Sequence, residues 1–342
     1  MTSCTVLSDS VADAHDSLLA IAGKSASVSV QQVEGVLAEL GGEAVHDHND
    51  AFFSTLNNNG SPLQLCHSLD SQGMMRLKLI VDPFAHLFPG NERLILTLGT
   101  INNIIQQRNS SPLFNRALQK LNDSFLPAVD DNGNQIKHNG GYCWLASDMR
   151  QKGLAVYYSP RHIEKDSWDC LAQFMTELGI QSSQLAWLSS LKKMGAKLAS
   201  VAVQEAKGQS ELKVYWRMTT PSPLSVQPHS MFTDPLLLES LAQLYPEHGV
   251  ASHGLLFSQS IDLSTGAFTG VKLDLCGHCL RYEENQWIDK LSHLPEGMLL
   301  KNAQVFFEDL KNFWRCGLDV AFVSLGIDTY GKSRCNLYWK IR

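Results

Sequence analysis

The chain has 342 residues, a formal net charge of −6 and 44% hydrophobic residues. An acidic balance argues against a nucleic-acid partner, and no apolar run approaches the roughly 20 residues of a membrane helix. The sequence lacks a basic start followed by an apolar stretch, and its eight cysteines read as free thiols, so we expect a cytoplasmic protein without a membrane partner.

Residues 1–58 are expected to form a helical element that precedes the main domain. Helical character is present around residues 11–19 and 30–40. Residues 59–342 are expected to form one domain, because a large barrel can occupy this length without dividing.

One unit recurs five times along the chain. Each copy contains two short strand-like runs joined by a turn, and four of the five copies continue into an amphipathic helical stretch. The second strands of the copies are expected at residues 76–83, 154–160, 211–216, 271–276 and 334–339. Repetition of this size predicts the architecture before any motif is considered.

The second strands have two different faces, because side chains alternate across a strand. One face is apolar in every copy, as in Leu77, Leu79 and Val81. The helices carry apolar stripes that would pack against this face, so the polar face must lie on the other side of the sheet. Closure of the sheet into a barrel would place the polar face in the lumen and would remove both sheet edges.

We therefore expect an α+β fold, a ten-stranded antiparallel β-barrel of five ββα-type repeats. Its helices lie outside, and a barrel of this width leaves a ligand chamber in the lumen. The alternative is an open sheet whose polar face meets solvent.

Five cations lie on the polar face of the second strands, and glycines at 73, 208, 270 and 331 are expected to mark the hairpin turns close to four of them. The cations are Arg76, Lys78, Lys213, Lys272 and Arg334. They should converge near one end of the barrel without acidic partners, so they would repel one another. This arrangement favours an anionic ligand, and its charge suits a diphosphate.

Three tyrosines from different copies, Tyr157, Tyr215 and Tyr338, project into the same lumen. Aromatic faces stabilise cations, so a diphosphate clamp beside tyrosines suits the ionisation of an allylic diphosphate. No Asp-rich DDxxD-type motif is present, so we expect no required cofactor; Asp274 is the residue that would recruit Mg²⁺.

These residues resemble the aromatic prenyltransferases of the ABBA barrel class, which include the dimethylallyltryptophan synthases, soluble bacterial phenol prenyltransferases and cyanobacterial enzymes. The resemblance covers roughly residues 60–342, with motifs at 75–83, 211–215 and 334–338 and a cation at Lys272. It implies a dimethylallyl diphosphate or similar prenyl donor, an aromatic small-molecule acceptor, and a monomer or weak dimer. The compact length is most similar to the hapalindole and ambiguine type of indole alkaloid enzymes.

Two positions depart from the indole enzymes. Ala155 stands where they have a lysine, and Gln64 stands where they have a glutamate that grips the indole N–H. The resemblance therefore leaves Gln64 and Asn336 as acceptor-binding candidates. Glu205 and Glu211 remain as weak candidates for the base.

The prenyl chain length depends on pocket depth, and Ile80, Met218 and Trp144 are candidates for setting it.

Two other classes of function stay open. A non-catalytic barrel that stores an anionic small molecule would share the cations but would not need the tyrosines. A zinc protein could be built on Cys276, His278 and Cys279, but a second C-x-x-C is missing. Candidates for its fourth ligand are His253, His293 and Cys316.

A Cys66–His67 catalytic pair is excluded because adjacent strand residues point to opposite faces.

Overall fold

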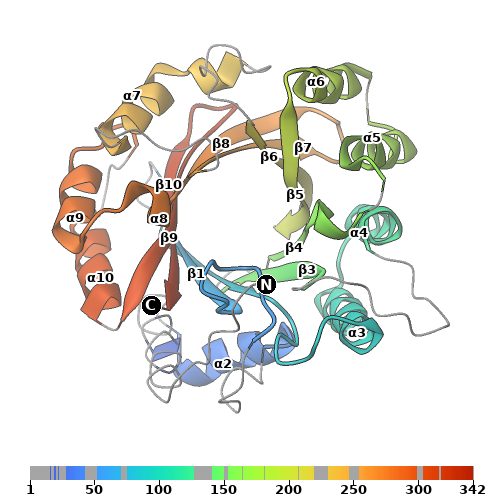
Figure 1. Ribbon diagram of the computed structural model, residues 1–342, viewed down its shortest axis with the longest axis horizontal. Coiled ribbons are helices and arrows are strands. Elements are labelled where there is room, and N and C mark those ends of the chain that lie inside the picture. The colour runs from blue at the N-terminus through green and yellow to red at the C-terminus, as the bar shows by residue number, and fades with distance from the viewer. Residues whose placement is uncertain are drawn as a thin grey trace.

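The computed structural model describes residues 16, 19–20, 22, 28–42, 52–70, 75–126, 141–149, 153–163, 165–180, 182–206, 208–218, 230–245, 254–298, 303–315 and 317–341. Its strands form one closed antiparallel barrel in which each strand pairs with its chain neighbours and β10 closes against β1 (Figure 1). The strands are β1 Leu63–Asp70, β2 Met75–Val81, β3 Cys143–Asp148, β4 Leu154–Tyr158, β5 Ala196–Ala206, β6 Gln209–Met218, β7 Leu255–Asp262, β8 Phe268–Cys276, β9 Leu318–Asp328 and β10 Ser333–Ile341. The predicted barrel is confirmed, and the open sheet is excluded.

The longer helices surround the barrel as an outer ring, and the short helix α8 follows directly after β8 (Figure 1). They are α2 Val30–Glu39, α3 Asn91–Arg108, α4 Pro112–Phe125, α5 Ser167–Glu177, α6 Ser182–Lys193, α7 Pro235–Leu244, α8 Gly277–Leu280, α9 Glu284–Ser292 and α10 Ala303–Arg315. Helix α2 confirms the helix predicted at residues 30–40, whereas most of residues 11–19 lie outside the described part of the chain. None of the helices in the described ranges has the length and apolar character needed to cross a bilayer.

The ends of several outer helices are set by local sequence. Helix α4 begins after Ser111, whose hydroxyl accepts the backbone N–H of Phe114, and proline occupies the first turn. Helix α5 begins after Asp166, whose carboxylate accepts two backbone N–H groups. These side chains satisfy donors that a helix start leaves unpaired, so they fix where each helix lies against the barrel.

The main core lies between the barrel wall and the helices. Leu79, Val156, Val214 and Leu273 on the outward strand faces are fully buried together with helix residues such as Phe174. The predicted packing of apolar strand faces against helix stripes is therefore confirmed. Burial of each large apolar side chain contributes about 1.5–3 kcal/mol to folding.

A buried ion pair fastens one wall of the lumen. Arg93 of α3 donates to the carboxylate of Asp82 at 2.5 Å and to the carbonyl oxygens of Pro83 and Phe53. Ser54 donates to the same carboxylate. The segment that leads into β1 is thus tied to β2 and α3, which places its following residues over the lumen.

The hairpin turns differ from prediction at one position. Gly208 and Gly331 have φ near +74° and lie in turns, as predicted, whereas Gly73 lies outside the described residues. Gly270 lies inside β8, and the turn before that strand is made at Gly266, with φ of 70°. A side chain at residue 270 would place its Cβ 2.9 Å from the carbonyl oxygen of Ile327, so this glycine permits close strand contact.

Candidate active site

The lumen contains a cavity of about 530 Å³, which we call the chamber. Its lining includes Ile80, Trp144, Tyr157, Tyr215, Met218 and Tyr338, with Lys272 and Asp274 among its polar groups. The chamber therefore combines aromatic and aliphatic walls with an ion pair. The three residues predicted to set pocket depth all border it.

A bulge in β5 shapes one side of the chamber. The pairing of β5 with β6 shifts between Leu198 and Ser200. Consequently Leu198, Ala199 and Ser200 all line the cavity, although a regular strand would alternate them between two faces.

Lys272 of β8 lies between two tyrosine rings. Its ammonium group is 5.1 Å from the ring centroid of Tyr215 and 5.3 Å from that of Tyr338, and it donates to the Tyr338 hydroxyl at 3.2 Å. It also lies 3.0 Å from the carboxylate of Asp274, which accepts the Ser324 hydroxyl. The lysine is 8% exposed, so its charge is held by the protein rather than by bulk water.

The predicted absence of acidic partners is wrong. Lys272 pairs with Asp274, and Lys213 lies 4.0 Å from Glu211 while donating to the amide oxygen of Gln204 at 2.8 Å. Burying ammonium groups without any counter-charge costs several kcal/mol each, and these carboxylates offset part of that cost. An arriving anion must therefore compete with resident carboxylates.

Of the five cations predicted to bind a diphosphate, Lys272 borders the chamber and the other four do not, although several of their charges lie close enough to influence one another. Burial is the main cause that lowers the pKa of Lys213 well below its usual value; Glu211 opposes this effect, and Lys78, Arg334 and Lys272 reinforce it. Burial likewise lowers the pKa of Lys78, with Arg334 and Arg76 adding to the effect. Arg76 and Lys78 border a second, small cavity of about 30 Å³.

The side chain of Arg334 on β10 packs against Gly326 of the neighbouring strand β9. A Cβ on Gly326 of β9 would come within 3.1 Å of the Arg334 Nε atom. The register pairs Gly326 with both Arg334 and Lys272. This glycine therefore gives the guanidinium room beside the lysine.

The three predicted tyrosines come together from β4, β6 and β10. The rings of Tyr157 and Tyr215 are 6.1 Å apart, and all three tyrosines border the chamber. Burial is the main cause that raises the pKa of each hydroxyl above its usual value. The rings therefore remain neutral phenols whose faces can stabilise positive charge.

The carboxylates proposed as bases occupy different places. Glu205 accepts the backbone N–H of Ser111 at the start of α4, and Glu211 accepts the hydroxyl of Thr269. Neither borders the chamber, whereas Asp274 does. This geometry moves the candidate base from Glu205 and Glu211 to Asp274, which sequence reasoning had considered for Mg²⁺ alone.

The acceptor-binding candidates also separate. Gln64 borders the chamber, and its amide nitrogen donates to Asn57 at 3.0 Å, which orients its carbonyl oxygen. Asn336 is buried between Arg334 and Tyr338 along β10 and does not border the chamber. Cys66 joins the small apolar cluster inside the lumen while His67 packs outside on Phe306, so the exclusion of that pair is confirmed.

Three further cations border the chamber and were missed from sequence. They are Arg161, Lys197 and Arg217. Arg217 continues the alternation of Lys213 and Tyr215 along β6 and could have been found by extending that strand by two residues. Arg161 lies after the end of β4, and the inward position of Lys197 depends on the bulge in β5. The alternation of side chains along a strand therefore predicts neither of them.

The sequence matches no protein-family model and has no match among curated proteins. Solved structures do resemble the chain. One is 6-dimethylallyltryptophan synthase from Micromonospora olivasterospora in complex with DMASPP and Trp, with a TM-score of 0.75, 18% identity and coverage of 96% of both chains.

Two others are the apo form of the prenyltransferase PriB (TM-score 0.75, 15% identity, 96% of this chain and 95% of that chain) and 5-dimethylallyltryptophan synthase from Streptomyces coelicolor (0.74, 13%, 96% and 97%). At these identities the likeness shows the fold: the chain has the barrel of these aromatic prenyltransferases. The resemblance inferred from sequence is confirmed at that level.

Proposed function

We propose that the chain is an aromatic prenyltransferase that moves a dimethylallyl or longer prenyl group from an allylic diphosphate to an electron-rich aromatic acceptor. The observation that carries this proposal is Lys272, whose ammonium lies between the rings of Tyr215 and Tyr338 at the chamber. A positively charged group beside neutral aromatic rings suits a reaction in which a diphosphate anion departs and leaves a carbocation, because the charge stabilises the anion and the rings stabilise the cation.

The neighbours' ligands support the two substrate classes. The Micromonospora enzyme was solved with DMASPP and Trp, and PriB was solved with L-tryptophan and dimethylallyl thiolodiphosphate. We extend these classes to this chain as a prenyl diphosphate donor and an indole acceptor, of which an indole alkaloid is one form.

The first step is ionisation of the donor. The carbon–oxygen bond breaks, and the diphosphate keeps the electron pair. Lys272 meets the charge of the diphosphate at the chamber, and Lys213, Lys78 and Arg334 add positive potential nearby. Their burial strengthens this attraction because water screens it little.

The second step joins the allylic cation to the acceptor. The faces of Tyr157, Tyr215 and Tyr338 stabilise the cation and exclude water from it. The carbonyl oxygen of Gln64 would accept the N–H of an indole ring. A ring carbon then attacks the cation, and a carbon–carbon bond forms.

The third step returns the ring to aromaticity. The ring carbon that formed the new bond loses its proton, and we assign the acceptor of that proton to Asp274, which borders the chamber. The same carboxylate lies 3.0 Å from the ammonium group of Lys272. A weak base suffices, because the cationic ring formed by the attack is a strong acid.

The test is diphosphate release from dimethylallyl diphosphate, measured with and without a panel of indole acceptors, in EDTA and in Mg²⁺. Lys272→Met should abolish acceptor-dependent release. The matched control is Lys193→Met, because Lys193 is exposed on α6 outside the barrel.

Diphosphate release that depends on the acceptor and persists in EDTA would support binding of the diphosphate by basic side chains without a metal ion. A requirement for Mg²⁺ would instead make Asp274 a metal ligand. Tight diphosphate binding without turnover on any acceptor would favour the non-catalytic barrel. Absence of binding in the wild-type protein would refute the assignment of the lumen.

We also propose that the protein is cytoplasmic and is a monomer or weak dimer. We place the boundary between the N-terminal element and the barrel domain between residues 58 and 59. The free thiols of the described cysteines are consistent with a reducing compartment. Size-exclusion chromatography with light scattering tests the oligomeric state.

A further inference from the structure

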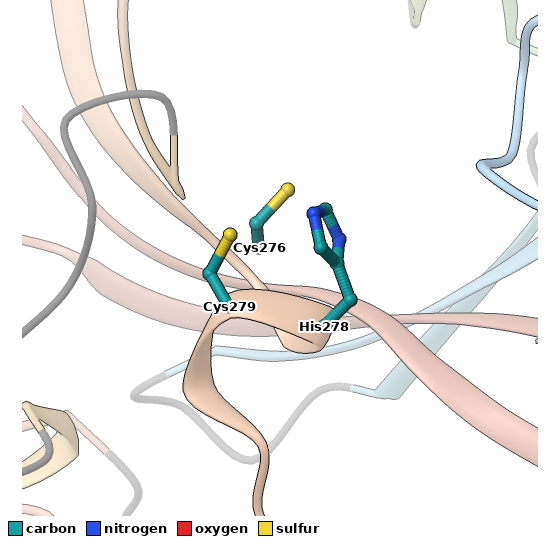
Figure 2. Close-up of side chains that lie close together, drawn as sticks. All are labelled: Cys276, His278 and Cys279. Atoms are coloured by element: carbon teal, nitrogen blue, oxygen red, sulfur yellow. The ribbon is translucent and has the colours of Figure 1, made fainter.

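A tight turn at the end of β8 gathers three side chains that ligate metals. Cys276 is the last residue of β8, and His278 and Cys279 lie in the short helix α8 that follows directly. Figure 2 shows the two sulfur atoms and the imidazole ring on the same side of this turn. Their ligand atoms all lie within 4.8 Å of one another.

These separations are close to what a tetrahedral metal requires. Bond lengths of about 2.3 Å to sulfur and about 2.0 Å to nitrogen place the ligand atoms of a tetrahedral zinc site roughly 3.5–3.8 Å apart. The separations therefore need to shorten by at most about 1.3 Å, which side-chain rotations supply.

The turn is held in place by the residue between the ligands. A Cβ on Gly277 would lie 2.0 Å from the carbonyl oxygen of Val320, so only glycine lets this backbone rest on β9. The backbone N–H of Arg281 donates to the Gly277 carbonyl at 3.1 Å and closes the turn. Cys276 itself is 4% exposed. The ligand atoms are thus carried by a fixed backbone rather than by a loose loop.

The group lies beside the chamber. Cys276 follows Asp274 by two residues on the same strand face and pairs in register with Phe322, and both of these neighbours line the cavity. Within the described residues no fourth histidine, cysteine or carboxylate joins the group.

Of the fourth ligands considered from sequence, His293 is described and does not join the group. His293 contacts its own helix at Asp289, and residues 253 and 316 lie outside the described part of the chain. The described part of the chain thus offers three protein ligands, and zinc sites with three protein ligands take water or an exogenous ligand as the fourth.

We propose that Cys276, His278 and Cys279 bind one zinc ion at the rim of the chamber, with the fourth position free for water or a ligand. Two sulfur ligands and an imidazole select a thiophilic divalent cation over Mg²⁺. Both thiols lose their protons when the metal–sulfur bonds form. This site is independent of the proposed prenyl transfer.

The test is titration of chelator-stripped, reduced protein with Zn²⁺ against a chromogenic chelator, together with Co²⁺ substitution. We expect one ion per chain and an absorption band from thiolate-to-cobalt charge transfer. Cys276→Ser, Cys279→Ser and His278→Ala should each weaken binding by at least about 100-fold, since even the loss of a residue that hydrogen-bonds a metal ligand costs about 10–100-fold. Cys170→Ser on α5 and His293→Ala directly after α9 are the matched controls and should bind as the wild type does.

Circular dichroism of the metal-free proteins separates a binding defect from misfolding, and His278→Ala removes an exposed side chain, so this variant should keep its fold. The proposal is overturned by unchanged zinc affinity in the cysteine variants, by a cobalt complex without the thiolate band, or by the absence of stoichiometric binding. It is also overturned if a Cys276–Cys279 disulfide persists under the reducing conditions of the titration.

Discussion

His67 offers a sharp test of how the barrel wall packs against its helices. The residue lies on the outward face of β1, 1% exposed, with its ring centroid 4.8 Å from that of Phe306 and 5.6 Å from that of Phe313 on α10. Burial lowers the pKa of its imidazole from 6.5 to about 4. The native state therefore holds this histidine neutral at a pH where an exposed histidine is charged.

The sign and size of the effect follow from linkage. The unfolded chain binds a proton at His67 below pH 6.5, while the native chain does not until about pH 4. Stability is thus fully present above pH 6.5 and is lost as the pH falls toward 4. Between pH 7.5 and pH 5 this one group should lower the free energy of unfolding by about 2 kcal/mol.

The assay is urea unfolding at pH 7.5 and pH 5, compared between the wild type and His67→Phe. The phenyl ring fills the same aromatic site without a titratable group, so the loss of stability between the two pH values should shrink by about 2 kcal/mol. His293→Gln is the matched control, because His293 is exposed. Identical pH dependence of His67→Phe and the wild type would refute the reasoning, as would an NMR titration that places the His67 pKa near 6.5.

Three predictions concern the lumen. Because burial lowers the pKa of Lys213, binding of inorganic diphosphate should take up a proton and should weaken as the pH rises through that lowered pKa, below 10.5; calorimetry in two buffers should detect this uptake, and Lys213→Met should reduce it. Tyr215→Ala should reduce turnover by about 10- to 30-fold by removing one aromatic face, while Tyr215→Phe should keep most activity; equal turnover in all three proteins would contradict the shielding role. Asp274→Asn should slow product formation yet strengthen diphosphate binding, because Lys272 loses its competing carboxylate; a weaker binding constant would count against this account.

Much of the architecture could be predicted because the alternation of side chains is local information. The spacing of Lys213 and Tyr215 puts both on one face of β6, and the same rule puts Leu212 and Val214 on the other. Recurrence of that pattern five times made closure into a barrel the arrangement that shelters both faces.

The positions of charges along the barrel axis could not be predicted, because they depend on register and bulges. Lys213 donates to the amide oxygen of Gln204 on the neighbouring strand β5, and the register that pairs Gln204 with Glu211 cannot be read from the local sequence. Glu205 accepts the backbone N–H of Ser111 at the start of α4, and these two residues lie far apart in sequence. The chamber wall at Lys197 depends on the bulge beside it.

Closure of the barrel between β1 and β10 also constrains how the chain is made. The ribosome completes β1 about 270 residues before β10, although the two strands pair residue by residue from Leu65–Trp339 to Asp70–Arg334. Until β10 emerges, β1 presents an unpaired edge, which is a template for aggregation. The nascent chain therefore needs protection at that edge for most of its synthesis, and a product shortened before β10 would be both inactive and prone to self-association.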